Sequence, residues 1–93
     1  MLAVGLSIAA GIVGAQADNL FWDPLLSGGG GGSGTWNLNG TANWFNGSAD
    51  EKWLDNSLTG TNTATFGGTA GTVTLNSGLT SSNLLFTAPG YTV

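Results

Sequence analysis

The chain has 93 residues, with one Lys or Arg against five Asp or Glu, and its net charge is −4. This length allows at most one small domain, and a chain so poor in cations cannot neutralise phosphates, which excludes a nucleic-acid partner. Because Cys and His are absent, disulfides, thiolate sites and Ser-His or Cys-His catalytic units are excluded as well.

Residues 1–17 form an uncharged, mostly apolar segment that ends in Ala15-Gln16-Ala17. Two small residues around one variable position, directly before a polar region, form the pattern that signal peptidases cut. We therefore expect a helical secretory signal peptide that is cleaved after Ala17, so that the membrane is involved only through export. The usual basic start is missing, since Lys52 is the sole cation. A short membrane anchor is the alternative, although the segment falls short of the ~20 apolar residues that span a bilayer.

The segment 18–34 combines a short aromatic strand with a glycine-rich run. The strand "LFWDP" (20–24) stops at Pro24, which cannot donate to a β-ladder. The run "SGGGGGSG" (27–34) has the composition of a flexible linker. It contains a literal G-x-G-x-x-G between Gly29 and Gly34. This motif neither follows directly on a clear strand nor opens a helix, so we expect no phosphate or other cofactor site there.

Residues 35–56 read as short strands with turns and one charged stretch. The units "TWNLNG" (35–40) and "TANWFNG" (41–47) each end in Asn-Gly, a strong tight-turn pair. The next stretch, "SADEKW" (48–53), contains Asp50 and Glu51, and Asp55 follows it. Two carboxylates can hydrolyse glycosides, but the chain offers one Lys and no other cation beside them. We therefore expect a solvated charged loop, no catalytic residue and no metal site.

Four Trp residues are the candidate ligand platform: Trp22, Trp36, Trp44 and Trp53. Flat rings of this kind stack on sugars, and this use would make the chain a small secreted carbohydrate-binding module. The competing interpretation is a structural core, because a domain with few Leu and Ile needs Trp to bury enough apolar area. The spacing of one Trp per short strand favours the core.

Period-two alternation predicts four strands in the last third of the chain. They are "TATF" (63–66), "TVTL" (72–75), "NLLF" (83–86) and "YTV" (91–93). Each places apolar residues on one face and Thr or Asn on the other, with Leu85 as the exception. Short strands at this spacing, with so little charge, favour a β-solenoid over a sandwich or barrel.

The order of these motifs resembles that of the autotransporter-associated β-strand repeat proteins. The likeness covers residues 20–93 and is carried by "FWDP", the Gly-rich run, "GTWN", "ANWF", "KW", "ATFGG", "GTVTL" and "LLFTAPGYTV". It implies a right-handed parallel β-helix passenger that is secreted or displayed outside the bacterial outer membrane, with a structural or adhesive role and no catalysis.

Members of that family continue through many further repeats, whereas this chain reaches only the strand at 91–93. We therefore expect residues 35–93 to form the N-terminal cap and first repeat strands of a solenoid whose strand continues beyond Val93. The partners expected are surface polysaccharide, other cells, or a second chain that pairs with the open strand edge.

Overall fold

The computed structural model describes residues 18–56, 58 and 60–93. The expected signal peptide, with Ala15 and Ala17 at its cleavage site, lies outside these residues. The described part is all-β and contains no helix, as the sequence predicts. Its strands are β2 (Asn19–Trp22), β3 (Gly34–Trp36), β4 (Trp44–Phe45), β5 (Asp50–Glu51), β6 (Thr63–Phe66), β7 (Val73–Leu75) and β8 (Asn83–Phe86).

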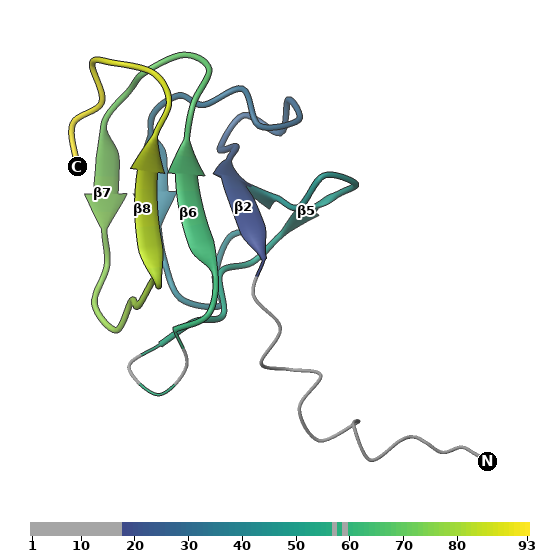
Figure 1. The fold of residues 1–93 in the computed structure, drawn as a ribbon, viewed down its shortest axis with the longest axis vertical. Helices are drawn as coiled ribbons and strands as arrows, with labels where there is room; N and C mark the ends of the chain where they lie inside the picture. The colour runs from purple at the N-terminus through teal and green to yellow at the C-terminus, as the bar shows by residue number, and fades with distance from the viewer. Residues whose placement is uncertain (1–17, 57, 59) are drawn as a thin grey trace.

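The larger layer is a five-stranded mixed sheet in the order β5-β4-β2-β6-β8. Strands β2, β6 and β8 run parallel and stand side by side in Figure 1. On the other edge of β2, the β4–β5 hairpin pairs antiparallel, with Trp22 opposite Trp44. The turn of this hairpin is the predicted Asn46-Gly47 pair, where Asn46 N donates to Ala49 O at 3.0 Å and Gly47 has a φ of +104°.

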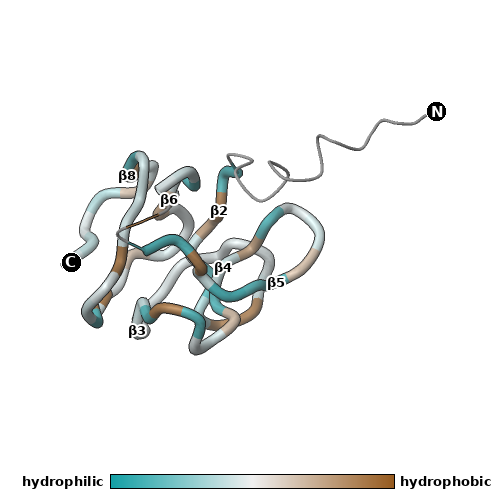
Figure 2. The backbone as a smooth tube through the Cα atoms, turned by 90° about the horizontal axis from the view of Figure 1, so that it is seen from below, coloured by the Kyte–Doolittle hydropathy of each residue, from teal (hydrophilic) through white to brown (hydrophobic). Residues whose placement is uncertain are grey.

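The smaller layer consists of β3 and β7, which also pair in parallel. Isolated bridges extend it: Gly31 pairs with Thr69, Leu38 with Trp53 and Thr72 with Thr92. Figure 2 shows β8, β6 and β2 in a row on one side of the molecule and β3 on the other. Apart from the antiparallel β4–β5 hairpin, neighbouring strands are parallel in both layers.

On the C-terminal side, the sequence separation between paired residues, called the step below, is the same in both layers. Residues 63–66 of β6 pair with residues 83–86 of β8, and Thr72 pairs with Thr92, so each pairing joins positions 20 apart. The earlier steps are longer and unequal, because Asn19 pairs with Thr63 and Gly34 with Val73. The longer path from β2 to β6 contains the β4–β5 hairpin.

Tryptophan rings fill the space between the layers. All four Trp are buried, together with Leu20, Ala64, Phe66 and Val73. Trp36 meets Trp53 edge-to-face with ring centroids 4.9 Å apart, and Trp22 meets Trp44 at 5.1 Å. Such pairs contribute about 0.5–1.5 kcal/mol beyond the burial of apolar area. The core thus depends on aromatic contacts more than on aliphatic ones.

The glycine-rich run is packed into the body of the protein. Gly31 N donates to Trp22 O at 3.1 Å, and Thr69 N donates to Gly30 O at 2.8 Å. Gly31 has a φ of +79°, and a Cβ there would collide with Gly67 O and the Tyr91 hydroxyl. Glycine is needed here both for the left-handed backbone and for the close approach of two chain segments.

The interpretation of residues 48–55 as a solvated charged loop is wrong for its carboxylates. Asp50 and Glu51 form strand β5 and are half-buried, and Asp55 is buried. The physical reason is the Asn46-Gly47 turn, which folds residues 50 and 51 back onto β4. Lys52, by contrast, is exposed as expected.

Candidate functional site

The most distinctive surface of the protein is its open end at β8. All four residues of this strand are exposed, and Leu84 and Phe86 keep 56% and 45% of their surface accessible. Leu75 and Val93 are each 50% exposed. Isolated apolar side chains are ordinary on a surface, but a contiguous apolar patch beside an unpaired strand edge indicates an interaction site.

The apolar positions of β8 lie in register with apolar positions of β6, one strand further in. In β6, the equivalent residues Ala64 and Phe66 are fully buried, because β8 covers them. Phe86 stacks on Phe66 with centroids 4.9 Å apart and an interplanar angle of 13°. The outer face of Phe86 therefore offers an incoming strand the contact that Phe66 offers to β8.

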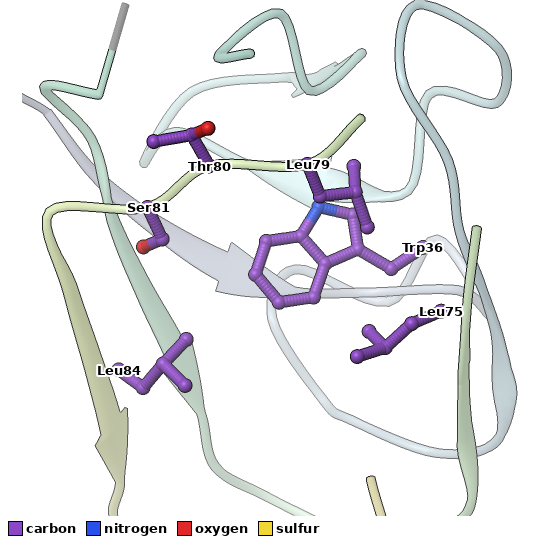
Figure 3. Close-up of a pocket in the computed structure, with 6 residues that line it drawn as sticks. All are labelled: Trp36, Leu75, Leu79, Thr80, Ser81 and Leu84. Atoms are coloured by element: carbon purple, nitrogen blue, oxygen red, sulfur yellow. The ribbon is translucent and has the colours of Figure 1, made fainter. Parts of the chain in front are cut away.

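A pocket of about 210 Å³ opens at this end between β7, β8 and the segment that joins them. Its lining consists of Trp36, Leu75, Leu79, Thr80, Ser81 and Leu84 (Figure 3). Pockets for small molecules usually measure ~300–1,000 Å³. This pocket is smaller and mostly apolar, so it suits one or two apolar side chains of a neighbouring strand.

The candidate Trp platform has no exposed aromatic face in this arrangement. Trp22, Trp44 and Trp53 are fully buried, and Trp36 retains 4% exposure where it lines the pocket. Trp22 Nε1 donates to Gly32 O at 2.8 Å, and Trp53 Nε1 donates to Thr80 O at 3.0 Å. These bonds tie the rings to neighbouring segments, and the rings would have to leave the core to stack on a sugar.

The candidate carboxylates Glu51 and Asp55 each accept hydrogen bonds from neighbouring groups of the chain. Asp55 Oδ2 accepts hydrogen bonds from the backbone N–H groups of Thr61 at 2.9 Å and Asn62 at 2.7 Å, which fixes the approach to β6. Glu51 Oε1 accepts from Asn46 Nδ2 at 2.7 Å. The described residues contain no group of three metal-ligating side chains. Each carboxylate therefore has a local structural partner.

A different acidic residue, Asp23, is the one that the structure singles out. It is fully buried, and its Oδ1 accepts from Ser27 N at 2.7 Å while Oδ2 accepts from Gly28 N at 2.8 Å. Burial opposes its ionisation, but the hydrogen bonds from Ser27, Asp50 and the following glycines outweigh burial and lower the pKa of Asp23 to about 2.

Asp50 lies against Asp23 and shows the opposite shift. Its own burial, together with the hydrogen bond to Asp23 and the repulsion from that charge, raises the pKa of Asp50 to about 6. The sequence contains a signal for Asp23, because Asp directly before Pro is typical of a turn that the Asp side chain caps. It contains no signal for the partnership with Asp50, which depends on how the β4–β5 hairpin packs.

Comparisons with protein-family models, with curated proteins and with solved structures find no match to the chain. Within the part of the chain that the structure describes, no helix is long and apolar enough to cross a membrane. The candidate site therefore has to be interpreted from its own geometry.

Proposed function

We propose that residues 18–93 serve as the capped first coils of an exported bacterial β-solenoid with a structural or adhesive role and no catalysis. The observation that carries this proposal is the 20-residue step shared by both layers, from β6 to β8 and from Thr72 to Thr92. A chain that returns to each layer after an equal number of residues builds coils that stack in register. This is how solenoids extend.

The two ends of the larger sheet support the same proposal because they differ in character. At one end, the antiparallel β4–β5 hairpin covers the edge of β2, and the outermost strand β5 has only two residues, both acidic. A short charged strand discourages further pairing. At the other end, β8 is apolar and open. A cap on one side and a growth face on the other are what the first coils of a solenoid require.

Export to the outside of a bacterium is part of the proposal and rests on the pattern of residues 1–17, which ends in Ala15-Gln16-Ala17. A passive role is supported by the local structural partners of Glu51 and Asp55. The partners proposed are surface polysaccharides or other cells, contacted by the Thr and Asn side chains on the outer faces of the coils. A second chain at the open end is the alternative partner.

The experiment that tests the proposal adds one coil. A second copy of residues 74–93 is appended after Val93, which places each copied residue 20 positions after its original. The copied "NLLF" is expected to pair with β8 and bury Leu84 and Phe86. The result should be a higher urea midpoint of unfolding, because Leu84 and Phe86 become buried under the added coil.

A matched control separates stacking from mere lengthening. In the control, the copied Leu and Phe that correspond to Leu84 and Phe86 are both replaced by Ser, while length and turns are unchanged. This chain should unfold at the midpoint of the original one. Equal stabilisation by both extensions, or stabilisation by neither, would contradict the proposed stacking of coils.

A further inference from the structure

The contact between Asp23 and Asp50 has no role in the proposed stacking of coils, yet it joins two separate parts of the cap. Asp23 directly follows β2, and the loop 24–28 folds back so that its amides reach the Asp23 carboxylate. Asp50 belongs to β5, where it lies opposite Phe45. The two carboxyl groups are therefore brought together by the packing of the β4–β5 hairpin beside this loop.

The hydrogen-bonding capacity of the two groups decides which of them holds a proton. Asp23 already accepts from Ser27 N, Ser27 Oγ and Gly28 N, at 2.7, 3.1 and 2.8 Å. Asp50 Oδ1 is buried and receives no donor from the described chain. A carboxylate with three donors favours its charged form, whereas a buried oxygen without a donor favours protonation. A proton on Asp50 supplies the donor that the pair lacks.

We propose that Asp23 and Asp50 form a proton-dependent latch that fastens the β4–β5 hairpin to the loop 23–28. With Asp50 protonated, its hydroxyl donates to the Asp23 carboxylate and the latch is closed. Loss of that proton at neutral pH leaves the charge of half-buried Asp50 against the charge of buried Asp23, and their repulsion loosens the hairpin. The latch thus strengthens the cap in mildly acidic surroundings.

The other charged groups around Asp50 leave this pairing intact. Strand β4, which pairs with β5, consists of Trp44 and Phe45 and brings no charge. On the side of Asp50 itself, Glu51 is held by Asn46 Nδ2, and Lys52 is exposed. The loop 23–28 contributes Asp23 and no second charged residue.

The sign of the pH dependence follows from the direction of each shift. The folded-state pKa of Asp50, about 6, lies above the ordinary value of 3.8. Its stabilising proton is fully present below the ordinary value and is lost as the pH rises through 6. Asp23 acts in the opposite direction, because its lowered pKa contributes stability that is present above the ordinary value and is lost as the pH falls toward 2. We therefore expect the stability that this pair contributes to be greatest near pH 4 and to fall as the pH rises to about 6.

The test compares the full chain with Asp50→Asn and with Glu51→Gln, by urea unfolding at micromolar concentration between pH 4 and 8. The original chain should show a midpoint that falls as the pH rises from 4 through 6 and levels off by pH 7.5. Asp50→Asn carries a permanent donor, so its midpoint should stay flat and should exceed that of the original chain at pH 7.5. Glu51→Gln, the neighbouring control, should retain the original slope.

A direct titration keeps the proposal testable even where Asp50→Asn fails to fold. In the unmodified chain, the carboxyl carbon of Asp50, followed by NMR, should titrate near pH 6, and the Asp23→Asn variant should return it toward 3.8. Titration of Asp50 at its ordinary value in the original chain would overturn the latch, as would an equal pH slope in the original and Asp50→Asn chains. Neither result would bear on the proposed stacking of coils, which the added coil tests separately.

Discussion

Replacement of Gly31 by alanine tests whether the glycine-rich run is a packed element of the fold. Gly31 has a φ of +79°, and an added Cβ would fall too close to Gly67 O, Thr69 O and the Tyr91 hydroxyl. An L-residue in the left-handed region costs about 1–2 kcal/mol. Overpacking of a tight buried site costs a further ~1–3 kcal/mol. We therefore expect Gly31→Ala to lower the free energy of unfolding by about 2–5 kcal/mol.

Gly28→Ala is the matched control, because it separates the backbone cost from the packing cost. Gly28 has the same φ of +79°, but an added Cβ there meets nothing within 4 Å. Its substitution should cost only the backbone penalty of about 1–2 kcal/mol. Urea unfolding followed by Trp fluorescence measures both variants, since the buried rings become exposed on unfolding. Equal losses in the two variants would refute the argument that Gly31 is required for close packing.

Two further predictions concern the core and the open end. Trp53→Phe removes the indole N–H that donates to Thr80 O at 3.0 Å, whereas Trp44→Phe removes an indole N–H without a partner in the described chain. Both rings are fully buried, so Trp53→Phe should be the more destabilising by about 1–2 kcal/mol in urea unfolding, and the reverse order would contradict the assignment of that bond. Leu84→Lys should abolish concentration-dependent association in sedimentation velocity, while Leu54→Lys, at the similar exposure of 58% against 56%, should not. Association that both variants lose, or that neither loses, would move the contact away from β8.

Three of the four strands predicted at the end of the chain are confirmed, because local alternation determines them, whereas the predicted strand 91–93 is reduced to the isolated bridge between Thr72 and Thr92. The pattern of "TATF" and "NLLF" predicts β6 and β8 with the observed bounds, and "TVTL" predicts β7 with one extra residue. Alternation gives the face of a side chain but not its burial, which depends on the neighbouring layer. Leu84 and Phe86 point with the apolar set and still remain half exposed, because the described chain places no strand beyond β8.

Thr65 shows the same limit in the opposite direction. The pattern predicts an outward, solvated residue, yet Thr65 is only 4% exposed. Its partners across the sheet are Phe21 on β2 and Leu85 on β8, which share its outer face. Large apolar neighbours on both sides cover a small Thr. Leu85, which interrupts the alternation, indicated from the sequence that part of the outer face is covered. The sequence could not show that Thr65 is the residue beside it, because that depends on the register of the strands.

The candidate site was less predictable than the strands, because its contacts join residues far apart in the sequence. Asp23 and Asp50 meet only after the Gly-rich loop and the β4–β5 hairpin have each folded. The interpretation of the four Trp as core residues, favoured by their spacing of one per short strand, is confirmed by their burial. The strands that cover them could not be read from the sequence, because they belong to a second layer in which Leu38 pairs with Trp53 and β3 pairs with β7. Side-chain chemistry was readable from the sequence, and its three-dimensional neighbourhood was not.

The 20-residue separation between paired residues of β6 and β8 also sets how much length an added coil would contribute. Strands in a sheet are ~4.8 Å apart, so 100 residues added at this step would lengthen the body by only about 24 Å, against about 150 Å for the same residues in one α-helix. Stacked coils therefore gain little length per residue, but they repeat the same surface position many times. A side chain kept at one position of every coil would recur every ~4.8 Å along a straight row. A row of that kind turns individually weak contacts into avidity that grows with the number of coils.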